Sequence, residues 1–248
     1  MNQAPRFSLV TPAYNESARL PLLLDSVDVA RAHYRGGAAA IEVIVGDNAS
    51  TDATAEIATA RGCRVAQITK RNIAAARNGG AAIAQGEILC FIDADSTIHI
   101  NTFNAIDDAM ASGKLVVGAT GVRPDRWSMG IFFTWLVATP ITWLAAVDAG
   151  VIFCHRRDFA AIGGYDESLR YAEDIQLLRM LKRHGREGQQ PGRKFGRAKH
   201  VLAITSMRKY DKHGDWHYFT LMPRIGFWLL VNHRRMEKEA DAYWYTDR

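Results

Sequence analysis

The stretch Ile88-Leu89-Cys90-Phe91-Ile92-Asp93-Ala94-Asp95-Ser96 runs five apolar residues directly into two carboxylates that are one residue apart. An apolar run with no polar face is typical of a strand buried on both sides within a parallel sheet. Ligands of such sheets bind just beyond the carboxyl ends of the strands, where Asp93 and Asp95 fall. Because neighbouring carboxylates repel each other, a divalent cation such as Mg2+ or Mn2+ favours their ionised forms. The structural alternative is an Asp that caps the next helix beside an Asp that faces water.

Strand-like and helix-like segments alternate on both sides of this stretch. Strands are expected at 7–11, 41–45, 64–69, 115–120, 150–154 and 201–205, and helices at 17–34, after 52, at 72–85, at 157–162 and after 173. This alternation predicts an α/β fold with a doubly wound, mostly parallel sheet.

Polar side chains follow each of the first four strands and should meet at one edge of the sheet. They offer an aromatic face, carboxylates for hydroxyls or a metal, and cations for phosphate, which together suit a nucleotide. The glycine signatures of common nucleotide sites are missing, because neither Gly-x-Gly-x-x-Gly after the first strand nor Gly-Lys-Ser/Thr occurs. The residues concerned are Tyr14, Glu16, Asp47, Lys70, Arg71, Asp93 and Asp95.

Four motifs in one order make the pattern specific. They are Ser8-Leu9-Val10-Thr11-Pro12-Ala13-Tyr14-Asn15-Glu16, Asp47-Asn48-Ala49-Ser50-Thr51-Asp52, Ala75-Ala76-Arg77-Asn78-Gly79 and Asp93-Ala94-Asp95. Together they resemble the nucleotide-sugar half of family-two glycosyltransferases with the GT-A fold, and the resemblance covers roughly residues 6 to 207. It implies one Rossmann-like GT-A domain at 1–207, with a nucleotide-binding half at 1–97 and an acceptor half at 98–207.

The resemblance also implies which residues contact the nucleotide. Glu16 would hold the ribose hydroxyls, Asp47 would accept a hydrogen bond from the base edge, and Arg77 would approach the base or the phosphates. The base pocket would be lined by Pro12 and Tyr14. The full expected set is Pro12, Ala13, Tyr14, Glu16, Asp47, Arg77, Asp93 and Ala94.

A divalent metal is implied at the diphosphate. Asp93 would face the ribose and the metal, and Asp95 would ligate the Mg2+ or Mn2+ that bridges the two phosphates. His200 follows Asp174 by 26 residues and is the first candidate for a third ligand, with His213 and His217 as alternatives.

The acceptor half contains a second carboxylate pair. In the family, the position of Asp174 carries the general base, which takes the proton of an acceptor hydroxyl as it attacks the anomeric carbon. Inversion at that carbon is expected from the resemblance alone. The donor sugar and acceptor would be met by Gly163, Gly164, Asp166 and Glu173, although acidic residues also favour a helix start for electrostatic reasons.

Two segments are candidates for contact with a membrane. Residues 127–147 carry no formal charge, yet a span there would separate motifs that must share one face, so flanking helices are expected instead. The basic excess lies entirely in the last quarter, since residues 192–248 hold 12 Lys/Arg against 6 Asp/Glu. Basic and aromatic residues in the helical extension expected at 208–248 suit an anionic lipid surface, and equally a helix packed on the sheet.

Location and partners follow from what else the sequence holds. Residues 1–6 lead straight into a strand without a signal peptide, and the three dispersed cysteines suit core thiols. A cytoplasmic protein attached peripherally to the membrane is therefore expected, with no nucleic-acid partner, because no known nucleic-acid module is present.

The sequence thus predicts an inverting, metal-dependent transferase that moves a sugar from a nucleotide diphosphate to an acceptor hydroxyl. A UDP-sugar is the default donor and a GDP-sugar the alternative, while a lipid, a glycan and a small metabolite all remain open as acceptors. One rival is a phosphatase of the haloacid-dehalogenase type that uses Asp93 and Asp95, although its later Gly-Asp-x-x-x-Asp motif is missing. The other is a catalytically silent protein that binds nucleotide sugars.

Overall fold

The computed structural model describes residues 4–145, 150–169, 172–188, 190–219 and 221. Its chain divides into two compact units, of which the first comprises 1–123 and 147–205 and the second 124–146 and 206–248. The segment 124–146 is therefore grouped with the C-terminal part of the chain, whereas the boundary expected from the sequence at residue 207 stays a prediction.

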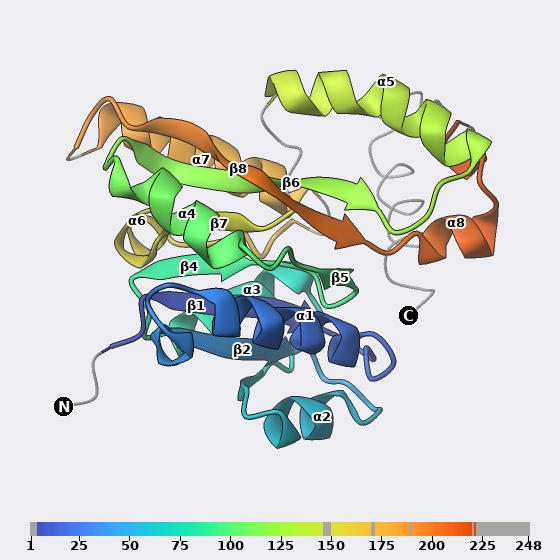
Figure 1. Cartoon of the computed structure of the whole chain (residues 1–248), viewed down its shortest axis with the longest axis horizontal. Coiled ribbons are helices and arrows are strands. Elements are labelled where there is room, and N and C mark those ends of the chain that lie inside the picture. The colour runs from blue at the N-terminus through green and yellow to red at the C-terminus, as the bar shows by residue number, and fades with distance from the viewer. Residues whose placement is uncertain (1–3, 146–149, 170–171, 189, 220, 222–248) are drawn as a thin grey trace. The chain divides into compact units, whose positions relative to one another are not determined.

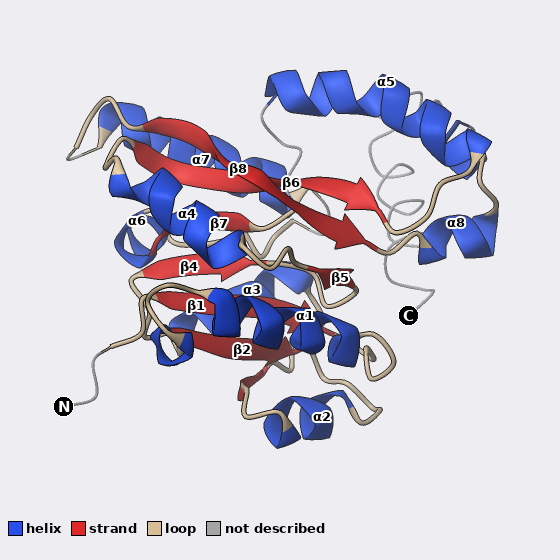
Figure 2. Cartoon of the chain, viewed as in Figure 1, coloured by secondary structure: helices blue, strands red, loops and turns tan. Residues whose placement is uncertain are grey.

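The first unit is built on one mixed sheet with the strand order β3-β2-β1-β4-β7-β6-β8-β5 (Figures 1 and 2). The strands β3, β2, β1 and β4 are parallel, and β4 pairs antiparallel with β7. This confirms the predicted α/β class, with the parallel half formed by the segments that carry the nucleotide motifs. The strands are β1 Phe7–Ala13, β2 Ile41–Asp47, β3 Arg64–Gln67, β4 Ile88–Phe91, β5 Ser96–Thr97, β6 Leu115–Pro124, β7 Ile152–His155 and β8 Lys194–Thr205.

Helices cover both faces of this sheet. Leu20 to Ala30 of α1 and Phe103 to Met110 of α4 contribute to one core cluster, and α3, α6 and α7 contribute to the other. The helices are α1 Leu20–His33, the 3-10 helix η1 Ala38–Ala40, α2 Thr54–Ala60, α3 Ile73–Ala82, α4 Thr102–Ala111, α5 Met129–Ala145, α6 Arg156–Ala161, α7 Glu173–Glu187 and α8 Arg208–His213.

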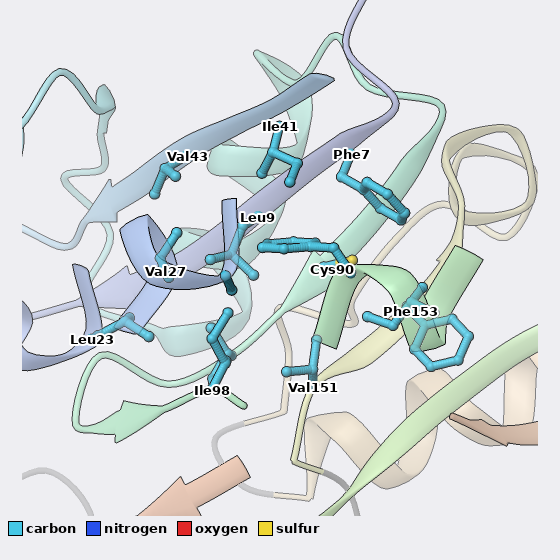
Figure 3. Packing of buried hydrophobic residues seen from close by; sticks show 14 of the residues in the cluster. Phe7, Leu9, Leu23, Val27, Ile41, Val43, Cys90, Ile98, Val151 and Phe153 are labelled. Atoms are coloured by element: carbon cyan, nitrogen blue, oxygen red, sulfur yellow. The ribbon is translucent and has the colours of Figure 1, made fainter. Parts of the chain in front are cut away.

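Strand β4 is buried on both faces, as its unbroken apolar run predicts. Ile88 and Cys90 belong to the cluster on the α1 side, while Leu89 and Phe91 belong to the cluster on the other side. Figure 3 shows Cys90 in the first cluster, among residues of β1, β2 and α1. The chain leaves this strand at Ile92, so Asp93 and Asp95 emerge at its carboxyl end.

Specific side chains mark the starts of α1 and α2. Pro21 lies in the first turn of α1, where a proline is tolerated because it lacks only an N–H that the helix start leaves unused. At the start of α2, the Asp52 carboxylate accepts from the backbone N–H of Thr54 at 3.0 Å and from its hydroxyl.

The second unit has a small core of its own around Ile131, Met207 and Tyr210. Arg126 ties its two segments together, donating from Nε to Asp211 and from Nη2 to Asp215, both at 2.8 Å. Across the residues that the structure describes, no helix is both long and apolar enough to cross a membrane. Most of the extension expected at 208–248 lies outside the described residues, which near this end stop at 219 and 221.

Candidate active site

Arg77 lies at the centre of a buried ion-pair network in the first unit. Its side chain, on α3, is only 4% exposed, and Nη1 donates to Glu173 Oε1 at 2.8 Å and to Asp174 Oδ1 at 2.9 Å. Nη2 donates to Asp93 Oδ1 at 2.8 Å. Burial by itself would lower the pKa of Arg77, but the carboxylates, Asp174 foremost, hold it well above its ordinary value. One guanidinium thus joins the metal motif to the carboxylate pair at the start of α7.

The two carboxylates of α7 are electrostatically unusual. Burial raises the pKa of both Glu173 and Asp174, and the nearby Arg77 charge opposes that rise. The Asp174 side chain is nevertheless 36% exposed, whereas that of Glu173 is 10% exposed. Asp174 therefore combines a basicity above that of an ordinary carboxylate with access to solvent, which is what a general base needs.

Tyr165 is a further member of the network that the sequence did not single out. Its hydroxyl donates to Asp174 Oδ1 at 3.0 Å, and its ring lies 5.2 Å from Phe91 and 5.9 Å from Phe159. The Arg77 guanidinium lies 5.1 Å from the centre of the same ring. The only signal in the sequence is an aromatic residue directly after the glycine pair.

The loop that carries Tyr165 is fastened to α3 by asparagines. Asn78 accepts from the Tyr165 N–H and donates to the Tyr165 carbonyl, both at 2.9 Å. Asn72 caps α3 through Ala75 N and also donates to the carbonyls of Glu167 and Leu169. Because α3 holds this loop at several points, it fixes both Arg77 and the approach to α7.

The predicted glycines at this loop have a conformational role. Gly163 and Gly164 have φ of +81° and +77°, in the left-handed region that favours glycine. A Cβ on Gly164 would also stand 2.7 Å from Asn78 Oδ1. Asp166, predicted to meet donor or acceptor, accepts from Ser168 N and Oγ. These contacts shape the loop.

The expected nucleotide residues lie at the carboxyl ends of β1 and β2. Ala13 pairs in register with Asp47, and Pro12 pairs with Gly46. A Cβ on Gly46 would stand 2.2 Å from the Ala76 carbonyl, so this glycine lets α3 pack closely against β2. Asp47 is buried, and its Oδ1 accepts from Ser50 N at 3.3 Å.

Tyr14 and Glu16 follow β1 in the loop expected for the base and the ribose. The Arg71 guanidinium lies 4.1 Å from the centre of the Tyr14 ring. The Glu16 side chain is buried, and its backbone N–H donates to Thr54 Oγ1 at 2.8 Å. An aromatic face, buried carboxylates and a cation therefore do gather at one edge of the sheet.

The metal ligands expected from the sequence are only partly assembled. Asp93 and Asp95 flank the buried Ala94, and their oxygen donors fit Mg2+ or Mn2+, which bind through few carboxylates and complete their shell with phosphates and water. His200 lies within β8, five residues before Thr205, and Thr205 pairs with Ser96. At about 3.3 Å per strand residue, roughly 16 Å separate it from that pairing.

His200 is therefore not brought together with Asp93 and Asp95. Consistent with this, no three His, Cys, Asp or Glu side chains are grouped for metal binding within the described part of the chain. The physical reason is the length of β8, which begins at Lys194, whereas the sequence suggested a strand that begins just after His200.

Comparisons with known proteins identify the family and the fold. The sequence profile of "Glycosyl transferase family 2" matches residues 8–130. A dolichyl-phosphate beta-glucosyltransferase of Trichomonas vaginalis is 29% identical over 133 residues, which cover 48% of this chain and 41% of that protein. This chain thus spans less than half the length of that curated relative.

Solved structures show the same fold. S. aureus TarS, in its complex with UDP-GlcNAc, superposes with a TM-score of 0.61 at 18% identity, covering 82% of this chain and 59% of that one. A mannosyltransferase of Pyrobaculum calidifontis, in complex with GDP-Man and Mn2+, gives a TM-score of 0.61 at 20% identity, covering 82% and 57%. The architecture is that of the GT-A glycosyltransferases, and this chain belongs to glycosyl transferase family 2.

Proposed function

We propose that this chain is an inverting glycosyltransferase that moves a sugar from a nucleotide diphosphate to an acceptor hydroxyl. The observation that carries the proposal is the bridge by Arg77 between Asp93, at the end of β4, and Asp174, at the start of α7. The donor edge of the sheet and a basic, accessible carboxylate are thus within reach of one guanidinium. A transferase needs its leaving group and its base in such proximity.

The chemistry assigned to these residues balances as a single displacement. Asp174 takes the proton of the acceptor hydroxyl, whose oxygen forms a bond to the anomeric carbon of the donor. The bond from that carbon to the diphosphate oxygen breaks, and its electron pair leaves with the nucleoside diphosphate. Attack on the face opposite the leaving group inverts the configuration at the anomeric carbon.

A divalent cation fits the carboxylates beside the donor. Asp95 and Asp93 would hold Mg2+ or Mn2+, which supplies positive charge that stabilises the departing diphosphate. Asp93 gives one oxygen to Arg77, and its side chain remains 54% exposed, so it also presents carboxylate to the donor side.

The nucleotide of the donor is UDP or GDP, with UDP as the first choice. Neighbours of the same fold have been solved with UDP-GlcNAc and with GDP-Man, which supports both. Tyr14, Glu16 and Asp47 would contact the base and the ribose.

A membrane surface is part of the proposal, and a lipid-linked acceptor follows from it. The second unit exposes large apolar side chains, and Thr134 and Thr142 donate their hydroxyls to carbonyls of their own helix. Polar groups satisfied inside the helix suit an apolar surrounding. One relative is named as a dolichyl-phosphate beta-glucosyltransferase, which supports an acceptor of this kind. We place the protein at the cytoplasmic face, where its three free thiols stay reduced.

The phosphatase alternative has little support in this fold. Its nucleophile would have to lie on the first strand, whereas Asp93 follows β4, which comes after three strand–helix units. Membership of the family also favours the transferase. The silent binding protein differs from the transferase only in activity.

Ligand-dependent thermal stability tests the proposal directly. Purified protein would be heated with UDP, GDP, ADP or CDP, with and without Mn2+, beside an Asp95→Ala variant. A ligand that binds the folded state raises Tm by mass action. We expect a Mn2+-dependent rise with UDP or GDP that Asp95→Ala loses. An Asp174→Asn variant should keep this rise in Tm but lose transfer. If none of the nucleotides raises Tm, the proposal is overturned.

A further inference from the structure

Within the described part of the chain, two side-chain hydrogen bonds reach the Asp174 carboxylate, and both end on Oδ1. Arg77 Nη1 donates to Oδ1 at 2.9 Å, and the Tyr165 hydroxyl donates to Oδ1 at 3.0 Å. Tyr165 itself is 3% exposed, and the Arg77 side chain is 4% exposed. The side chain as a whole is 36% exposed, and Oδ2 accepts neither of these two bonds.

We propose that Tyr165 is a positioning residue for Asp174, which fixes the carboxylate through Oδ1 so that Oδ2 faces the acceptor hydroxyl. This rests on the proposed role of Asp174 as the base. In the reaction, the acceptor proton passes to Oδ2, while Oδ1 keeps both of its hydrogen bonds. The rotation of the carboxylate is thereby restricted, and a base held in one orientation needs less reorganisation before the transfer.

A buried tyrosine needs a hydrogen-bond partner in any case, so packing alone could explain a hydroxyl with some acceptor. Here the ring is already held by other means. The backbone N–H and carbonyl of Tyr165 are hydrogen-bonded to Asn78, and its ring makes T-shaped contacts with Phe91 and Phe159. The hydroxyl contributes little to placing the ring, so its described bond serves the carboxylate.

The ring and the hydroxyl can be separated by substitution. Tyr165→Phe keeps the ring, its backbone bonds to Asn78 and its contacts with Phe91, and it removes only the oxygen. Phe159→Leu is the matched control, because it weakens the same aromatic cluster without touching Asp174. Donor hydrolysis, with water as the acceptor, supplies a rate that does not require the natural acceptor.

The measurement is kcat and KM for UDP-GlcNAc or GDP-Man, whichever nucleotide stabilises the protein, followed as release of the nucleoside diphosphate. A hydrogen bond to a charged group is worth roughly a tenfold change in rate or more. We expect Tyr165→Phe to lower kcat about tenfold with KM for the donor changed less than about twofold. Phe159→Leu should lower Tm and leave kcat within about twofold.

A second readout covers the case in which Tyr165→Phe is also destabilised. The charged groups that face Asp174 are Arg77, Glu173 and Asp93, together with the Tyr165 hydroxyl. Loss of one donor to the ionised carboxylate should move the acidic limb of the kcat profile to higher pH, which loss of packing alone would not do.

The outcomes separate the two proposals. Unchanged kcat and pH profile in Tyr165→Phe, or a rise in KM alone, would overturn the role of Tyr165 while the transferase stands. If the wild type neither binds a nucleotide nor turns over a donor, the proposed function fails, and the role of Tyr165 fails with it.

Discussion

Asn78 holds both backbone polar groups of Tyr165, accepting from its N–H and donating to its carbonyl at 2.9 Å each. Asn78 directly follows Arg77, so two consecutive residues of α3 reach the loop before α7 and the start of α7 itself. The third contact of Asn78 is with Glu167 Oε1 at 3.0 Å. This short helix therefore fixes the geometry between the donor edge of the sheet and the proposed base.

Removing the Asn78 side chain should destabilise the first unit. Asn78→Ala loses three hydrogen bonds and leaves the Tyr165 backbone groups without them, which we expect to cost about 2 kcal/mol in the free energy of unfolding. The measurement is a urea unfolding curve. Asn101→Ala is the control, because Asn101 is exposed and its side chain caps nothing. Equal losses of unfolding free energy in the two variants would contradict the role of Asn78 in holding Tyr165.

The fork of the Arg77 guanidinium should not be replaceable by lysine. Lysine keeps the charge, but it cannot donate to Asp93 and to both α7 carboxylates at once. Arg77→Lys should therefore lower the free energy of unfolding by about 2 kcal/mol. Arg61→Lys is the matched control, because Arg61 also bridges two carboxylates, Asp25 and Asp28, but at the surface. Exposed pairs are worth about 0–1 kcal/mol. Urea unfolding of both variants decides, and a loss confined to Arg61→Lys would refute the prediction.

Much of the site was accessible from the sequence because strand ends and motif order place it. The apolar run of β4 placed Asp93, and the resemblance to the family singled out Asp174. The partner of Arg77 was not accessible: an arginine in a motif looks like a phosphate ligand, and only the packing of α3 reveals the carboxylates around it. Tyr165 was missed for a similar reason, because only the folded loop brings its hydroxyl to Asp174.

The sequence also failed to predict the direction of one strand pairing and the length of one strand. An unbroken apolar run indicates burial but carries no information on whether its neighbours run parallel, so the antiparallel pairing of β4 with β7 was not predicted. Spacing along the sequence suggested His200 as a metal ligand. The length of β8 places this histidine away from the end of the strand.

The rate should fall in mild acid because the base must be ionised. Burial raises the pKa of Asp174 and Glu173, so the proton should bind at a pH above the ordinary carboxyl value of about 4. The kcat for donor hydrolysis is then expected to decline as pH falls through that raised value, which belongs to the coupled pair. Tm measured across the same range controls for unfolding. A rate that stays flat down to pH 4 would contradict the raised pKa.

Acid stability should depend on Asp52. Burial alone would raise its pKa, but hydrogen bonds from Thr54 and Ser17 lower it to about 2. Because the folded value lies below the unfolded one, the stabilisation is full above about pH 4 and disappears as pH falls toward about 2. The stability advantage of wild type over Asp52→Asn, from urea unfolding, should therefore shrink as the pH falls from about 4 to about 2. An advantage that is constant with pH would contradict this assignment.

Lipid vesicles should bind the apolar surface of the second unit. Exposed apolar and aromatic side chains bind the interface in proportion to the area they bury. We expect the protein to float with vesicles containing anionic lipid, because Arg208, Lys209 and Lys212 of α8 belong to the same unit. The surface consists of Trp127, Met129, Phe132, Phe133, Leu136, Val137, Trp216 and Phe219.

Matched pairs of substitutions test whether this surface is responsible. Phe132→Ser with Leu136→Ser, at 49% and 56% exposure, should abolish flotation. Leu22→Ser with Val29→Ser is the control, because both residues are 51% exposed on α1 of the first unit. If both double variants float like the wild type, the surface is not the contact. If wild type forms dimers that only the first pair disrupts, a second copy of the chain, and not lipid, covers it.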